Sequence, residues 1–112
     1  MIVAIVGSRY FPRTLPIHAV VAELKDGDSV ISGGAVGVDS EVRVACRIHC
    51  KPILEIKPNY IRHGKQAPLI RNQAIAEACD RMIAFWDGRS RGTMHAVGCA
   101  RRLGKPVDIV RP

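Results

Sequence analysis

The sequence predicts one α/β domain over residues 1–112, with a Rossmann-like, doubly wound architecture built on a five-stranded parallel sheet. Three observations predict this fold. Short runs rich in Val and Ile alternate with amphipathic segments, which is typical of β-α-β units. The short runs are apolar throughout, as expected for strands that helices cover on both faces. Glycines and prolines stand at the boundaries between segments. We expect the strand order 3-2-1-4-5, with about four helices distributed over both faces.

Each element follows from a local pattern. The predicted strands are Ile2–Val6, Ser29–Ser32, Ile53–Ile56, Met82–Trp86 and Val107–Val110. The predicted helices are Leu15–Lys25, Val38–Cys50, Pro68–Cys79 and Thr93–Leu103. Pro16 and Pro68 suit the first turn of a helix, where proline lacks only an N–H that would have no partner. The connection Lys57–Ala67 is the only long one, and we expect either a crossover loop or a functional lid there.

Composition and charge narrow the classes of function. The chain has 112 residues, 47% of them hydrophobic, and no apolar run approaches the roughly 20 residues that cross a bilayer. The apolar start of the chain is too short for a signal peptide, so we expect a cytoplasmic protein without membrane contact. The formal net charge of +7 favours anionic partners. The basic side chains at Arg43, Arg47 and Lys51 fit a solvated helix face better than a nucleic-acid-binding stripe.

Four cysteines lie in predicted helices, at Cys46, Cys50, Cys79 and Cys99. This placement favours reduced, packed thiols over a disulfide framework. Cys46, His49 and Cys50 are one helical turn apart, but the paired spacings typical of zinc sites are missing. We therefore predict no metal and no cofactor.

Small residues, hydroxyls and arginines follow three of the predicted strands. The segments are "GSR" (Gly7, Ser8 and Arg9), "GGAVGVD" (Gly33 to Asp39) and "DGRSRGT" (Asp87 to Thr93). In a doubly wound sheet, ligands bind beyond the carboxyl ends of the strands. Glycines allow a backbone to approach a ligand closely, and the starts of the following helices favour phosphate. These segments predict a crevice formed by three loops for a phosphate-bearing ligand.

Several side chains have both a structural and a functional interpretation. Ser90 and Thr93 could cap a helix or donate to phosphate oxygens. Arg71, near the start of a helix, could bind an anion through two N–H groups. Trp86 could stack on a base or pack in the core. The sequence contains no dinucleotide-binding G-x-G-x-x-G after the first strand, no P-loop and no nucleophile elbow.

Four segments resemble one superfamily when they are taken in order: "AIVGSR", "VISGGAVGVD", "RNQAIAEACDRMIAFWDGRSRGT" and "GKPVDIV". Together they resemble the SLOG superfamily, which includes the DNA-processing protein DprA and the Lonely Guy phosphoribohydrolases, and they are most similar to its small YspA-like branch. The resemblance implies that the crevice is lined by the first loop (Gly7, Ser8, Arg9), the second loop (Gly33, Gly34, Gly37, Asp39), the pair Arg71 and Asn72, and a phosphate loop (Gly88, Gly92, Thr93).

The sequence departs from the Lonely Guy enzymes at one point. Those enzymes follow "GT" with glutamates that assist cleavage of the N-glycosidic bond, whereas here Met94, His95 and Ala96 follow Thr93. His95 falls at the first of those positions and could act as an acid or base. The catalytic candidates are therefore Arg71, Asp39 and His95, with Asp87 as a further carboxylate.

Three functions follow as hypotheses. The first is binding or sensing of a nucleotide or nucleotide-derived ligand, such as a nucleoside monophosphate or an ADP-ribose-like molecule. The second is hydrolysis of the N-glycosidic bond of a nucleoside 5′-monophosphate. The third is binding of single-stranded nucleic acid in the manner of DprA. The resemblance also implies a homodimer or a higher homo-oligomer.

Overall fold

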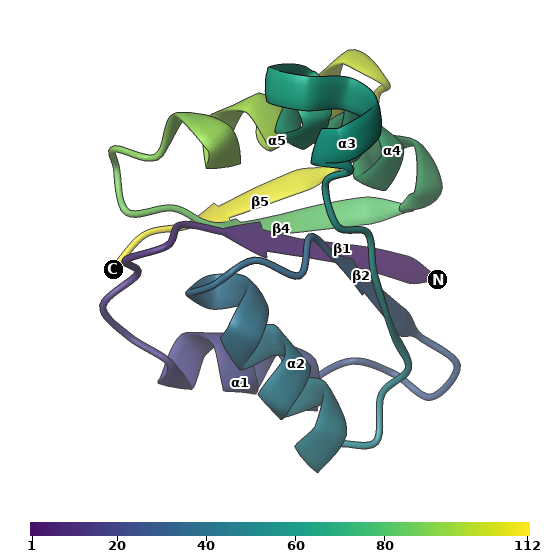
Figure 1. Ribbon diagram of the computed structural model, residues 1–112. Helices are drawn as coiled ribbons and strands as arrows, with labels where there is room; N and C mark the ends of the chain where they lie inside the picture. Colours follow the sequence, from purple (N-terminus) through teal and green to yellow (C-terminus); the bar gives the residue numbers. More distant parts are fainter.

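Five parallel strands form the centre of the molecule, in the order β3-β2-β1-β4-β5 (Figure 1). The computed structural model describes residues 1–112. The strands are β1 (Ile2–Gly7), β2 (Ser29–Ser32), β3 (Ile53–Glu55), β4 (Arg81–Phe85) and β5 (Val107–Val110). Every neighbouring pair is parallel, and β1 in the middle pairs with both β2 and β4. The predicted fold class and strand order are confirmed.

Four helices cover the two faces of this sheet. The helices α1 (Leu15–Ala22) and α2 (Val38–Ile48) lie on one face, and α4 (Ala67–Ala78) and α5 (Arg91–Arg102) lie on the other (Figure 1). Pro16 and Pro68 stand in the first turns of α1 and α4, as predicted. None of the helices combines the length and hydropathy that spanning a membrane requires.

The alternation of side chains along β1 divides the core into two halves. Val3 and Ile5 pack with apolar residues of α1 and α2, whereas Ala4 and Val6 pack with apolar residues of α4 and α5. All four side chains are almost completely buried. Because both faces are covered, the central strands contain no alternating polar positions, which explains their continuous apolar pattern.

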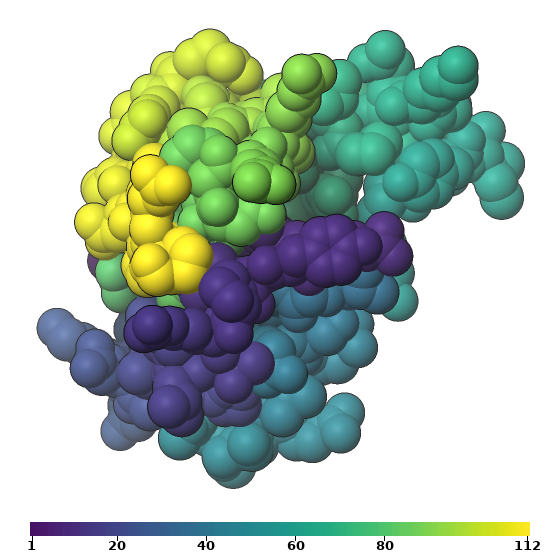
Figure 2. Space-filling view, turned by 90° about the vertical axis from the view of Figure 1, so that its left-hand side faces the viewer, coloured from purple at the N-terminus to yellow at the C-terminus, as the bar shows by residue number.

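The predicted long loop is wrong in part, because Lys57–Ala67 contains a short helix. Helix α3 (Tyr60–His63) is followed by the 3₁₀ turn η1 (Gly64–Gln66). The side chain of Asn59 caps α3, since its Oδ1 accepts from the N–H of Arg62 at 3.1 Å. None of the α3 side chains is buried, and the teal segment around it projects from the body of the molecule (Figure 2).

All four long helices end earlier than predicted, α4 and α5 by one residue and the other two by more. Helix α1 ends at Ala22 rather than Lys25, and α2 ends at Ile48 rather than Cys50. The backbone of Cys50 has φ of 53°, which breaks the α-helical conformation. Cys46, Cys79 and Cys99 are buried as predicted, whereas Cys50 is exposed, so the expectation of a packed thiol is wrong there.

Candidate functional site

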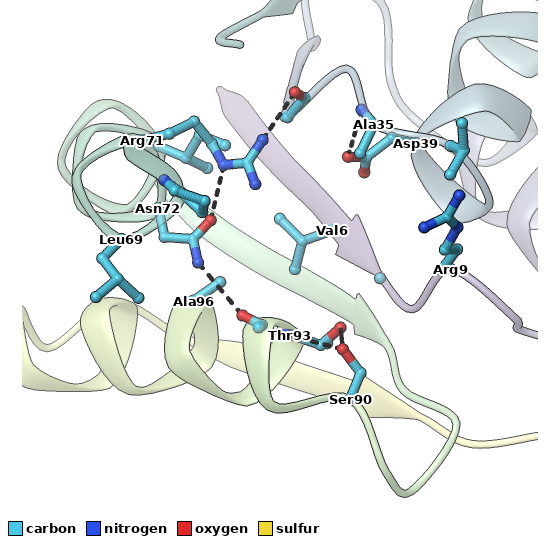
Figure 3. A pocket seen from close by; sticks show the side chains of 16 residues that line it. Val6, Arg9, Ala35, Asp39, Leu69, Arg71, Asn72, Ser90, Thr93 and Ala96 are labelled. Carbon is cyan, nitrogen blue, oxygen red and sulfur yellow. Dashed lines mark hydrogen bonds between the residues drawn. The ribbon is translucent and has the colours of Figure 1, made fainter. Parts of the chain in front are cut away.

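A cavity of about 250 Å³ opens at the carboxyl ends of the strands. Figure 2 looks onto this end, where the purple loop after β1 lies between the green start of α5 and the blue segment around α2. The lining residues that the sequence predicted are Gly7, Arg9, Gly33, Asp39, Arg71, Asn72, Ser90, Gly92 and Thr93. The lining residues that it missed are Val6, Ala35, Val36, Pro68, Leu69, Ile75 and Ala96. The three predicted loops and α4 therefore meet around one cavity (Figure 3).

Arg71 extends from the first half of α4 toward the loop after β2. Its Nε donates to the Oδ1 of Asn72 at 2.9 Å, and its Nη1 donates to the carbonyl oxygen of Gly33 at 2.9 Å. Its Nη2 has no hydrogen-bond partner in the protein, and the guanidinium group faces the cavity (Figure 3). Two neutral acceptors thus fix the group, and its positive charge has no carboxylate within ion-pair distance.

Asp39 supplies the only carboxylate of the cavity lining. It lies in the first turn of α2, is only 6% exposed, and accepts from the N–H of Ala35 through Oδ2 at 3.1 Å. Its other oxygen, Oδ1, is enclosed by the protein and has no hydrogen-bond partner. Burial raises the pKa of the Asp39 carboxyl above its usual value, while the Ala35 N–H and the charge of Arg71 lower it in part.

Gly33 lies between Arg71 and Asp39. A Cβ atom at this position would lie 2.5 Å from Nη1 of Arg71 and 3.0 Å from Oδ2 of Asp39. Gly33 does not need its glycine for a left-handed backbone, because its φ is not positive. The lack of a side chain therefore matters here for space: it lets both charged groups approach the same stretch of backbone.

Two other predicted glycines bring the loops together. A Cβ at Gly37 would overlap the backbone of Arg9, and a Cβ at Gly7 would lie 2.6 Å from the side chain of Val38. Gly37 also has φ of 85° and ψ of −127°, a conformation that only glycine adopts readily. Gly37 lies outside the cavity lining, and its role in this structure is to let the first two loops touch.

Hydroxyl groups and one carboxylate organise the loop between β4 and α5. Ser90 caps α5, since its Oγ accepts from the N–H of Thr93 at 3.2 Å. Asp87 accepts from the N–H groups of Arg89 and Ser90, both at 2.8 Å, and these bonds lower the pKa of its carboxyl. The buried Ser8 joins the first loop to this one by accepting from the N–H of Asp87 at 3.0 Å.

The start of α5 faces the cavity with unpaired backbone donors. The first N–H groups of a helix have no intrahelical acceptor. That of Thr93 is capped by Ser90, while those of Arg91 and Gly92 have no partner. These donors, together with the partial positive charge of the helix start, suit an anion.

The remaining predicted site residues lie outside the cavity lining: Ser8, Gly34, Gly37, Trp86, Asp87, Gly88 and His95. The ring of Trp86 is covered by the guanidinium group of Arg111 at 5.1 Å, and its Nε1 donates to the carbonyl oxygen of Ser90 at 3.0 Å. Trp86 therefore supports the β4–α5 loop from outside. His95 is turned toward Asn72, with 3.1 Å between its Nδ1 and the Nδ2 of Asn72.

The missed lining residues are mostly apolar. Val6, Ile75 and Ala96 line the cavity from β1, α4 and α5, and in the sequence they read as ordinary core positions. Val36 and Leu69 line it while remaining 55% and 41% exposed, so apolar side chains are accessible to a ligand at this cavity. In the sequence, Val36 stands among glycines, which is the one signal that could have indicated its position.

Known structures resemble this chain closely in fold. One match is DNA processing protein A (DprA) from Helicobacter pylori, with a TM-score of 0.78 and 23% sequence identity. The structure of that protein was described for its single-stranded DNA binding mode. The match covers 97% of this chain and 64% of the DprA chain, so this chain spans less than two thirds of that protein. The fold is of the SLOG type.

A second structure with this SLOG-type fold is that of the protein TM1055, a structural genomics target. It matches with a TM-score of 0.71 and 22% identity, over 95% of this chain and 71% of that one. No protein-family model and no curated protein sequence matches the chain. At these identities the likeness establishes the SLOG-type fold, and function has to be argued from the site.

Proposed function

We propose that this SLOG-type protein binds a nucleotide or nucleotide-derived ligand, with the phosphate between Arg71 and the start of α5. The observation that carries the proposal is the guanidinium group of Arg71. It faces the cavity, is held by neutral acceptors and has no carboxylate partner. A fixed, unpaired guanidinium group is suited to binding a phosphate through two N–H groups.

The size of the cavity favours a small ligand. Its volume of about 250 Å³ lies just below the range of about 300–1,000 Å³ that is usual for small-molecule sites. A nucleoside monophosphate, partly exposed at the mouth, suits this space better than the larger ADP-ribose-like molecules. The exposed apolar side chains of Val36 and Leu69 would contact the base, and Asp39 would accept from a sugar hydroxyl through Oδ2. We also propose that the chain belongs to the YspA-like branch of the SLOG superfamily.

Calorimetry with the adenosine, guanosine, cytidine and uridine 5′-monophosphates tests this proposal, with the unphosphorylated nucleosides for comparison. At least one monophosphate should bind at least about tenfold more tightly than its nucleoside, because a charge-assisted hydrogen bond contributes about 1.5–3 kcal/mol. Arg71→Ala should remove most of this difference. Arg101→Ala, an exposed arginine in the last turn of α5, is the matched control and should bind normally.

Either of two results would contradict the proposal. If no monophosphate binds, or if Arg71→Ala binds as the native chain does, the phosphate does not lie at Arg71. Chromatography of the same mixtures would show whether free base is released. Release that disappears in Asp39→Ala would favour the phosphoribohydrolase hypothesis, since Asp39 is the only carboxylate in the cavity lining.

Single-stranded nucleic acid is a second candidate ligand. Two observations favour it: the likeness to DprA and the formal net charge of +7. Arg9, Arg13, Arg89 and Arg91 follow β1 and β4 at the cavity end of the sheet, and the ion pairs of the chain involve other residues. Such a patch would bind the phosphate backbone without reading its sequence.

A further inference from the structure

A partly buried hydrogen-bond network, with Asn72 at its buried centre, extends from Arg71 behind the cavity wall into α5. Asn72 is only 6% exposed and contacts three groups. Its Oδ1 accepts from Nε of Arg71 at 2.9 Å, and its Nδ2 lies 3.3 Å from the carbonyl oxygen of Gly92 and 3.1 Å from Nδ1 of His95. One amide therefore connects α4 with the first turn of α5.

The partners of Asn72 determine which way its amide points. The Nε–H of Arg71 can only donate, and the carbonyl oxygen of Gly92 can only accept. The amide oxygen must therefore face Arg71, and the NH₂ group must face Gly92 and His95. If the amide were turned over, it would place donor against donor and acceptor against acceptor at two buried contacts.

This orientation determines the proton position on His95. An NH₂ group donates, so Nδ1 of His95 must accept, and the proton of the neutral ring must be on Nε2. Burial lowers the pKa of His95, and the nearby positive charge of Arg102 lowers it further, so the neutral ring is favoured. Cys99 lies beside the ring with its Sγ 3.9 Å from both nitrogens, and it donates or accepts only weakly.

We infer that Asn72 and His95 are positioning residues, which hold the Arg71 guanidinium group at the cavity through one chain of oriented hydrogen bonds. Gly92 and His95 accept from the NH₂ group of Asn72 and so keep its amide oxygen turned toward Nε of Arg71. His95 does not line the cavity, so we place it as a residue that acts through Asn72 rather than as an acid or base on the ligand. The inference rests on the proposed function only where Arg71 is taken to bind the ligand.

Nitrogen-15 NMR tests the chain without any ligand. At neutral pH the ring of His95 should show a protonated Nε2 and an unprotonated Nδ1. The Nε–H of Arg71 should exchange with water about tenfold faster in Asn72→Ala than in the native chain, because its acceptor is removed. Gln73→Ala is the matched control: this neighbouring side chain on α4 is bonded only to Glu77, and exchange should be unchanged.

Asn72→Asp, a substitution of nearly equal shape, should place the His95 proton on the opposite ring nitrogen from the native chain. Asn72→Asp keeps an acceptor for Nε of Arg71 but presents a carboxylate oxygen to Nδ1 of His95. The proton of His95 should then move to Nδ1 and the pKa of the ring should rise, while the Arg71 Nε–H remains protected. If the side chain at position 72 does not face Nδ1 of His95, the ring proton should stay on the same nitrogen as in the native chain.

Acid titration adds a readout within the native chain. When Nδ1 of His95 takes up a proton, it can no longer accept from Asn72, so the protection of the Arg71 Nε–H, measured relative to a free arginine side chain at the same pH, should fall with the same midpoint as the His95 titration. The groups near the ring that carry charge or titrate are Cys99 and Arg102 on α5, and Arg71 beyond the amide on α4. In His95→Phe this pH dependence should disappear. This second variant tests the network even if Asn72→Ala does not fold.

Calorimetry with adenosine 5′-monophosphate then tests whether binding requires the Arg71 guanidinium group to be held by Asn72. The dissociation constant should rise about tenfold in Asn72→Ala, with no change in Gln73→Ala. If none of the four monophosphates binds the native chain, the proposed function fails and the NMR results alone decide the network. A proton on Nδ1 of His95 in the native chain, or equal Arg71 exchange in Asn72→Ala and Gln73→Ala, would overturn the inference.

Discussion

The positions of the Arg71 and Asp39 side chains at the cavity depend on Gly33, which has no side chain. Gly33 accepts the Nη1 donor of Arg71 with its carbonyl oxygen and leaves room for Oδ2 of Asp39 on the same stretch of backbone. The two charges are thereby kept near each other without forming an ion pair. An anionic ligand can then use the charge of Arg71, because Asp39 does not neutralise it directly.

Gly33→Ala should weaken binding of the monophosphate about tenfold, because the new methyl group would displace Nη1 of Arg71 from its position. The free energy of unfolding should fall by about 1–3 kcal/mol, as overpacking usually costs. Calorimetry and urea unfolding measure the two effects. Gly98→Ala in α5 is the control, since its methyl group would meet only the end of the Arg102 side chain, at 3.3 Å. Normal binding by Gly33→Ala would show that Arg71 is not held at Gly33.

Asp39→Asn should raise the free energy of unfolding at neutral pH, because it replaces a carboxylate whose charged form is disfavoured by burial with a neutral side chain of nearly the same shape. Folding raises the pKa of Asp39 above 3.8, so the folded state binds the proton more tightly than the unfolded state does. The carboxylate therefore costs stability at pH 7, and this cost decreases as the pH falls through the folded-state pKa. Thermal unfolding from neutral to acidic pH should show the gain of Asp39→Asn shrinking toward zero. A gain independent of pH, or a loss at pH 7, would contradict the raised pKa.

At the scale of the elements, the loops of the site are joined by backbone contacts that a side chain would prevent. Gly37 precedes α2 and touches the backbone of Arg9 in the loop after β1. Ser8, on the same loop, accepts from Asp87 in the loop after β4. Three loops that start at different strands therefore support one another, and a change in one is expected to move the other two.

Gly37→Ala should lower the free energy of unfolding by more than about 3 kcal/mol, since both its backbone conformation and its contact with Arg9 exclude a side chain. Gly27→Ala is a matched control with φ of 88° and open space around the position. It should cost about 1–2 kcal/mol, the cost of the left-handed conformation alone. Urea unfolding of both variants measures the difference. Equal losses would show that the contact between the loops contributes nothing.

The elements also show which parts of the fold the sequence could predict. The runs of Val and Ile predicted all five strands, because strands covered on both faces leave no polar positions to confuse the pattern. The short α3 was missed since "NYIRHG" has no apolar periodicity and buries nothing. Its one signal was Asn59, which caps the helix.

The site was predictable where it depends on strand ends and not where it depends on tertiary packing. The three loops, Arg71 and Asn72 meet at the cavity because parallel strands place their carboxyl ends on one edge. The sequence left open whether Trp86 stacks on a base or packs in the core, and the structure places Arg111 over its ring. That contact joins the ends of β4 and β5, and a sequence pattern does not reveal it.

At the scale of the whole molecule, five arginines without ion-pair partners stand at the end of the sheet where the cavity opens. Arg9, Arg13, Arg71, Arg89 and Arg91 belong to this end of the sheet, and none of them is in an ion pair. At the opposite end, Asp28 pairs with the N-terminal amino group and Asp26 pairs with Lys51. These five charges near the cavity favour an anionic ligand over a cationic one.

Binding of labelled single-stranded oligothymidylate should weaken steeply as salt is raised from about 50 mM to about 200 mM, if the second candidate function holds. Each phosphate that the chain neutralises contributes about −0.7 to the slope of log K against log salt. Replacing both Arg89 and Arg91 with Ala should reduce the slope by about 1.4, whereas Arg101→Ala at the far end of α5 should not change it. Fluorescence anisotropy measures these slopes. Binding that ignores salt would exclude backbone contacts by these arginines.

The lining of the cavity runs from Val6 to Ala96 and draws on β1, the β2–α2 loop, α4 and the start of α5. No fragment of the chain contains a usable part of it, so a ligand can bind only after the central strands and both helical layers have assembled. Occupancy must then stabilise the entire domain against unfolding, by an amount that grows with the logarithm of ligand concentration above the dissociation constant. The abundance of such a protein in a cell would therefore depend on the supply of its ligand.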